Sequence, residues 1–202
     1  MTLLLLLGAP LLAAVPPPDY RAALLSGVEA EADALLAQGE LDAAEGLVRD
    51  FRAQVADDPR LVYEAGLIAN LQGKPRDAER LYRQALDQDA GMAFAWYDLG
   101  GLLLAQGDLA QARDAFIKAS DASEDHPKGW AAPLQLALIA ARDQDPIALE
   151  RWLREGIRRG LRFRDIAGHP EWTEVLRDPT LGEVLKRLIV VYGEESLLQQ
   201  WQ

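Results

Sequence analysis

The 202-residue sequence contains no cysteine, which excludes disulfide bonds, thiolate metal sites and a cysteine nucleophile. It has only two histidines, His126 and His169, and each stands directly before a proline. We therefore interpret both as loop residues. Aromatic residues make up only 7% of the chain, whereas Ala, Leu, Arg, Asp and Glu dominate. This composition predicts a mainly α-helical protein.

Positive charge is scarce. The chain has 21 Lys and Arg against 32 Asp and Glu, for a formal net charge of -11. A protein with this charge repels polyanions, so we do not expect nucleic acid as a partner.

The sequence also lacks the motifs that catalysis or phosphate binding requires. The glycines at 100, 101 and 107 are not followed by Lys-Ser or Lys-Thr and do not form a G-x-G-x-x-G fingerprint. No serine stands in a G-x-S-x-G elbow. The acidic clusters at 29–33 and 121–125 are typical of a solvated helix face and a turn. We expect no enzyme activity, cofactor or metal, with a hydrolase that uses acidic residues as a minor alternative.

The first residues form an apolar run, Leu3 to Val15, followed by three prolines. Its length is typical of a signal-peptide core and is shorter than the ~20 residues that span a bilayer. No Lys or Arg precedes the run, and no clean small-x-small cleavage site follows it. We predict a signal peptide or disordered leader over residues 1–18, with export to the periplasm or the medium. An uncleaved segment would instead contact a membrane, and a cytoplasmic location follows if the segment is not a signal.

A 34-residue interval recurs through the middle of the chain. It relates Gly39, Gly73 and Gly107; Ala44, Ala78 and Ala112; Val48, Tyr82 and Phe116; Gly66 and Gly100; and Ala85 and Ala119. Apolar residues at three- and four-residue spacing predict helices over 25–37, 61–72 and 93–106. The glycine after each stretch favours a helix end, and a second helix then begins. Each interval therefore predicts two antiparallel helices, and the recurring Gly66 and Gly100 indicate that these helices pack closely.

The unit that starts at Ala93 identifies the kind of repeat. Trp96, Leu99 and Gly100 form the pattern W-x-x-L-G, and Ala112 and Phe116 follow in A-x-x-x-F spacing. This unit resembles the tetratricopeptide repeat (TPR) family. The resemblance implies an all-α fold in which antiparallel helix pairs stack into a right-handed superhelical array, or solenoid, with capping helices at its end.

The register divides the chain into segments. In order, they are the leader 1–18; three TPR units within 19–126, at about 25–58, 59–92 and 93–126; a degenerate fourth helix pair, 127–160; and C-terminal capping helices, 161–202. In the fourth pair Pro133 stands where a leucine is expected, and the turn at 142–146 lacks the glycine. The last segment is predicted to contain short helices at 169–176, 178–185 and 194–201.

The TPR resemblance implies a function. In that family the first helices of the repeats line a concave groove that holds peptides or partner helices. The matching positions here are Arg60, Tyr63, Leu67, Asn70, Phe94, Tyr97, Gly101 and Leu104. The predicted partner is another protein or a peptide segment, and the Lys and Asn set that clamps a terminal carboxylate in some members is missing. Two alternatives stay open. In one, Tyr63 and Phe94 serve only to pack the repeats or the N-terminal segment. In the other, the chain is a structural factor that acts by self-association or tethers an envelope complex.

Arginines gather between residues 151 and 165 of this acidic chain. They are Arg151, Arg154, Arg158, Arg159, Arg162 and Arg164. One interpretation is that they favour a helix C-terminus and cover apolar surface with their stems. The other is a basic patch that docks an acidic partner or an anionic surface.

Overall fold

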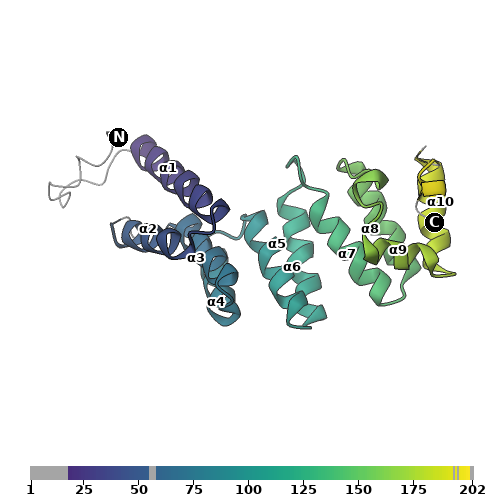
Figure 1. The fold of residues 1–202 in the computed structure, drawn as a ribbon, viewed down its shortest axis with the longest axis horizontal. Helices are drawn as coiled ribbons and strands as arrows, with labels where there is room; N and C mark the ends of the chain where they lie inside the picture. Colours follow the sequence, from purple (N-terminus) through teal and green to yellow (C-terminus); the bar gives the residue numbers. More distant parts are fainter. Residues whose placement is uncertain (1–17, 55–57, 193, 195, 201–202) are drawn as a thin grey trace.

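The computed structural model describes residues 18–54, 58–192, 194 and 196–200, and all regular structure in these residues is helical. The helices form an elongated array with α1 at one end and α10 at the other (Figure 1). Their bounds are α1 Pro18–Ala37, α2 Leu41–Gln54, α3 Pro59–Leu71, α4 Pro75–Gln88, α5 Ala93–Ala105, α6 Leu109–Ala122, α7 Ala131–Arg142, α8 Pro146–Arg158, α9 Pro170–Arg177, α10 Leu181–Val191 and α11 Ser196–Gln200, with a short 3-10 turn at Phe163–Asp165.

The predicted leader, 1–18, lies outside the described residues except for Pro18, at which α1 begins. The first helix is therefore longer than the predicted range 25–37. None of the helices in the described part of the chain is long and apolar enough to cross a membrane.

Helices α1 to α8 form four pairs, as the repeat interval predicts. The two helices of each pair pack together, and each second helix also contacts the first helix of the next pair. The predicted all-α solenoid is confirmed. Stacking of this kind buries a continuous core along the array, because no single pair can cover its own apolar face.

Glycines end the first helix of the first three pairs. Gly39, Gly73 and Gly107 have φ angles of 77°, 72° and 84°, a region that side chains with a Cβ rarely enter. In the fourth pair Gln144 takes the same role with φ 56°. Asp145 then caps α8 by accepting hydrogen bonds from the backbone N–H of Ile147 and Ala148 at 3.0 and 2.9 Å. The fourth turn thus keeps its shape without glycine.

The glycines inside the first helices permit close packing, as predicted. A Cβ placed on Gly66 would lie 2.8 Å from the ring of Tyr82, and one on Gly100 would lie 2.9 Å from the ring of Phe116. Both rings are almost fully buried. Tyr82 of α4 and Phe116 of α6 therefore pack directly onto the backbones of α3 and α5, in space that a side chain at position 66 or 100 would otherwise occupy.

Two adjacent glycines in α5 give a matched test of this packing. We expect Gly100→Ala to lower the free energy of unfolding by about 1–2 kcal/mol, because its methyl group meets the Phe116 ring. We expect Gly101→Ala to raise it by about 0.5–1 kcal/mol, because a Cβ there meets nothing within 4 Å and alanine favours the helix. Urea denaturation followed by circular dichroism measures both. Equal effects of the two substitutions would contradict the packing role of Gly100.

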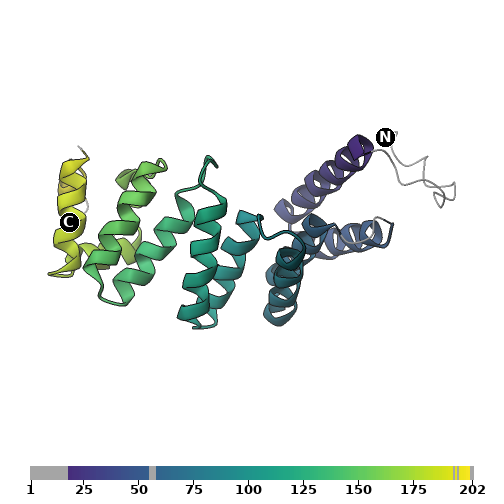
Figure 2. The ribbon, with the colours of Figure 1, turned by 180° about the vertical axis from the view of Figure 1, so that it is seen from behind.

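The C-terminal helices close the array. Phe163, Trp172 and Leu185 are buried together with α8 and the end of α7 in one apolar cluster. The partly buried Trp152 joins this cluster to the core of the preceding repeats. Glu194 accepts backbone hydrogen bonds from Phe163 and Arg164 at 3.0 and 3.3 Å. The same end of the molecule, seen from behind in Figure 2, shows α8 to α10 stacked beyond α7.

Candidate partner-binding surface

Side-chain contacts join the first helices of the four pairs in one continuous surface. The Arg60 guanidinium of α3 lies 3.5 Å from Glu29 of α1. The hydroxyl of Tyr63 in α3 donates a 2.6 Å hydrogen bond to Asp98 of α5. Gln135 of α7 donates a 3.3 Å hydrogen bond to the hydroxyl of Tyr97 in α5. We call the surface that α1, α3, α5 and α7 form the first-helix face; it includes Glu29, Asp33, Arg60, Tyr63, Glu64, Phe94, Tyr97, Asp98 and Gln135.

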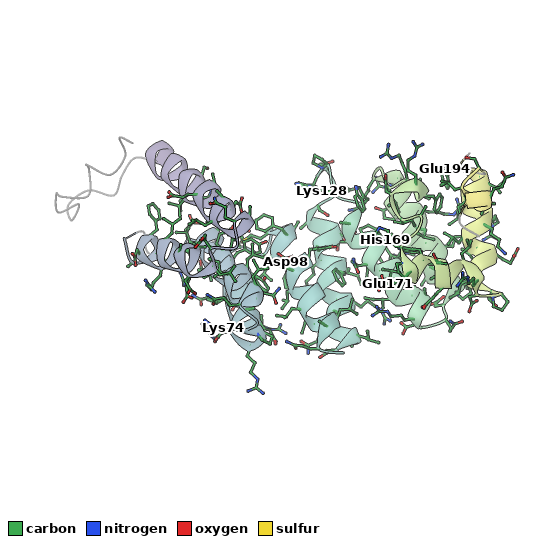
Figure 3. The ribbon with its side chains drawn as sticks, viewed as in Figure 1. Lys74, Asp98, Lys128, His169, Glu171 and Glu194 are labelled. Carbon is green, nitrogen blue, oxygen red and sulfur yellow. The ribbon has the colours of Figure 1, made fainter. Side chains whose placement is uncertain are left out.

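Tyr63 lies at the centre of this face and is mostly buried. Its side chain is only 9% exposed, and its ring stacks on Tyr82 with centroids 5.7 Å apart. Burial raises the pKa of the Tyr63 hydroxyl, and the charge of Asp98 raises it further. The hydroxyl therefore stays protonated and keeps its bond to Asp98. Asp98 is labelled near the middle of the array in Figure 3. Tyr63 joins two repeats together and offers little surface to a partner.

Phe94, unlike Tyr63, exposes part of its aromatic ring to solvent. It is 50% exposed, although its ring meets the Tyr63 ring edge-on with centroids 4.7 Å apart. Asn70 and Gly101 are exposed, whereas Leu67, Tyr97 and Leu104 are half-buried. The predicted groove residues thus lie on the first helices, and their contact with a partner stays a prediction.

Arg60 is held by carboxylates of its own chain. Asp58 caps α3 by accepting a 3.1 Å hydrogen bond from the Arg60 backbone N–H, and it also lies 3.2 Å from the guanidinium. With Glu29 on the other side, the positive charge of Arg60 is already offset. Its predicted role as a groove contact is weakened by these ion pairs.

The sequence-based site omitted a group of acidic residues on this face. Glu29 and Asp33 come from α1, Glu64 from α3 and Asp98 from α5. Burial, together with the charges of Asp33, Glu29 and Asp98, raises the pKa of Glu64 to about 7. Burial also raises the pKa of Asp98, against the opposing hydrogen bond from Tyr63. Glu64 and Asp98 stand one repeat interval apart, and each directly follows a tyrosine, Tyr63 or Tyr97. This recurrence in the sequence is the signal that could have identified them.

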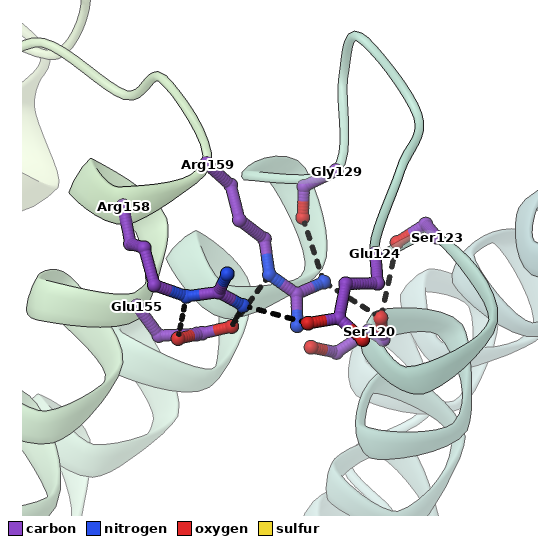
Figure 4. Close-up of polar contacts among 7 residues, drawn as sticks. All are labelled: Ser120, Ser123, Glu124, Gly129, Glu155, Arg158 and Arg159. Carbon is purple, nitrogen blue, oxygen red and sulfur yellow. Dashed lines mark hydrogen bonds and ion pairs between the residues drawn. The ribbon is translucent and has the colours of Figure 1, made fainter.

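The arginines of α8 and the following turn lie mostly beside carboxylates. Arg158 lies 2.7 Å from Glu155 and 3.1 Å from Glu124, and Arg159 donates a 2.7 Å hydrogen bond to the Ser120 carbonyl (Figure 4). These arginines donate hydrogen bonds to Glu155 and lower its pKa to about 2. The remaining pairs are Arg154 with Glu150, Arg162 with Asp165 and Arg164 with Glu194, while Arg151 lies over the Trp152 ring. Docking of an acidic partner here stays a prediction, with most of the charge already neutralised.

A sequence profile described as Tetratricopeptide repeat matches residues 29–75 and 71–127. Residues 29–127 belong to the tetratricopeptide repeat family. No curated protein matches the sequence of the chain.

Solved TPR-like structures share the fold over most or part of the chain. PilF of Pseudomonas aeruginosa has a TM-score of 0.65 at 16% identity and covers 87% of each chain. SycD, a type III secretion translocator chaperone of Yersinia enterocolitica, has a TM-score of 0.54 at 16% identity, over 61% of this chain and 88% of its own. PcrH, solved with the chaperone binding region of PopD, has a TM-score of 0.53 at 20% identity, over 60% and 95%. At these identities the similarity establishes the fold.

Proposed function

We propose that this TPR chain is a protein-interaction scaffold that binds a segment of a partner protein on its first-helix face. The observation that carries the proposal is Phe94, whose side chain is 50% exposed on a surface otherwise anchored by buried contacts. An exposed aromatic ring on a rigid support is the kind of residue that supplies much of the binding energy at protein interfaces.

The structural neighbours support this proposal. SycD is described as a translocator chaperone, and PcrH was solved with the chaperone binding region of another protein. Both share with this chain the stacked helix pairs that create a long surface from first helices. Binding of a partner segment is therefore compatible with the fold, and the partner itself must be found by experiment.

Truncation of Phe94 tests the proposal. We expect Phe94→Ala to reduce the amount of partner that co-purifies with the tagged full-length chain from its native host by about fivefold or more. The matched control is Ile147→Ala, which removes an 81% exposed apolar side chain from α8, a second helix. Quantitative mass spectrometry measures the recovered protein. If Phe94→Ala and Ile147→Ala both retain the partner at the parent level, the first-helix face is not the binding surface.

A further inference from the structure

The four acidic residues of the first-helix face carry more negative charge than the neighbouring cation neutralises. Glu29, Asp33, Glu64 and Asp98 come from three successive first helices, and the other three all act electrostatically on Glu64. The nearby cation is Arg60, and it is shared between Asp58 at 3.2 Å and Glu29 at 3.5 Å. Like charges held together by a rigid fold favour a bound cation.

Glu64 shows this imbalance most clearly. Glu64 is only 8% exposed. Its Oε2 atom is buried and has no hydrogen-bond partner in the described part of the chain. Buried polar atoms almost always have a partner, and an unpaired carboxylate oxygen is costly. The charged groups that act on this carboxyl are all acidic. Glu64 therefore has a carboxyl oxygen without a hydrogen-bond donor among the described residues, and the charged groups that act on it are negative.

The spacing of these carboxyl groups indicates which kind of cation they can bind. No group of three Asp, Glu or His side chains among the described residues is placed to hold a metal ion. A cation on a long stem can instead reach a spread-out cluster. Asp33 is exposed and Glu29 and Asp98 are half-buried, so their oxygens are the ones within reach, while Glu64 adds its charge from a buried position.

We propose that the partner segment carries a lysine or arginine whose cationic group lies among Glu29, Asp33, Glu64 and Asp98. The inference rests on the proposed function, since it names the chemistry of the segment that the first-helix face binds. The exposed Phe94 ring, which contacts Tyr63 beside Asp98, is placed to pack against the aliphatic stem of such a side chain.

Other occupants match this surface less well. The chain's own first 17 residues contain no Lys or Arg, so that segment offers no cationic side chain. In a second copy of the chain, the arginines of α8 are mostly engaged with carboxylates such as Glu150 and Glu155. A basic segment of a different protein supplies the charge without breaking existing ion pairs.

The test uses three short labelled peptides of the same apolar sequence, whose central residues are lysine, glutamine or glutamate. Fluorescence anisotropy with the full chain measures their affinities. We expect the lysine peptide to bind about tenfold more tightly than the glutamine peptide, and the glutamate peptide to bind least. Asp33→Asn with Asp98→Asn should remove most of the lysine preference. Glu64→Gln, which leaves every accessible carboxylate in place, should weaken lysine-peptide binding several-fold at pH 8.

A matched control separates this site from the overall negative charge. Glu45→Gln with Asp77→Asn changes the net charge equally but acts on α2 and α4, away from the first-helix face. We expect it to change lysine-peptide binding less than twofold. Equal losses in the two double variants, or equal binding of the lysine and glutamine peptides, would overturn the proposal. So would self-association that Asp33→Asn with Asp98→Asn abolishes, because the occupant would then be a second copy.

The two proposals fail in different ways. If the lysine and glutamine peptides bind equally and Phe94→Ala weakens both, the first-helix face binds segments but does not select a cation. If Phe94→Ala leaves both peptide binding and partner recovery unchanged, the proposed function itself is wrong.

Discussion

Phe116→Ala is expected to lower the free energy of unfolding by about 3–5 kcal/mol, the largest loss among the substitutions considered. Phe116 is 1% exposed and fills the space above Gly100, where no Cβ is present to take its place. Its ring also meets Tyr97 edge-on with centroids 5.5 Å apart. Removing the ring therefore leaves a cavity between α5 and α6 that the glycine cannot fill.

Urea denaturation followed by far-ultraviolet circular dichroism measures this loss. The control is Phe94→Ala, which removes the same ring from a position that is 50% exposed and should cost less than about 1 kcal/mol. Because repeats interact mainly with their neighbours, hydrogen exchange should show the greatest loss of protection in α5 and α6. A loss for Phe116→Ala no larger than that for Phe94→Ala would show that the glycine-aromatic contact contributes little.

Glu64→Gln is expected to stabilise the protein at alkaline pH. Burial and three neighbouring carboxyl groups raise the pKa of Glu64 from 4.5 to about 7. Between these values the folded state binds the proton more tightly than the unfolded state, so the free energy of unfolding falls as the pH rises through this window. Above pH 8 the loss is about 3 kcal/mol, and glutamine, which does not ionise, removes it.

The pH dependence identifies the cause. Glu64→Gln and the parent should have nearly equal stability at pH 4, where Glu64 is protonated, and differ most at pH 8. The groups that face Glu64 are Glu29 and Asp33 of α1, Asp98 of α5, and the tyrosines Tyr63 and Tyr82. The control Glu31→Gln, at an exposed position of α1, should change stability by less than about 0.5 kcal/mol at either pH. Destabilisation by Glu64→Gln at pH 8 would mean that its carboxylate has a partner in the folded protein.

The repeat interval predicted the helix pairs because each pair depends on contacts that are close in sequence. Gly73 and Gly107 turn the chain where their φ angles require glycine. Gly66 and Gly100 meet aromatic residues that follow 16 positions later in the same unit, so the spacing already placed them together. The use of Gln144 in the fourth turn could not be predicted, because a non-glycine residue with positive φ is tolerated only when its surroundings hold it there.

The candidate site was predicted less completely. The family pattern placed Tyr63 and Phe94 on the same face, but it did not show that Tyr63 is buried while Phe94 is half-exposed. The acidic character of the face was missed, because Glu64 and Asp98 looked like ordinary polar residues of a helix. Glu150 and Glu155 stand three or four residues before Arg154, Arg158 and Arg159, a helix spacing from which these ion pairs could have been predicted. The contact of Arg158 with Glu124 could not, because Glu124 lies in another repeat.

The amino-acid sequence by itself determined that this protein is a stack of helix pairs, because helix periodicity, glycine turns and pair packing all act over less than one repeat. The tertiary structure decided which side chains of the first helices are buried, exposed or charged without a partner. Those properties depend on how each repeat packs against the next, and the contacts of Tyr63 with Asp98 and Phe94 form only when α3 and α5 come together.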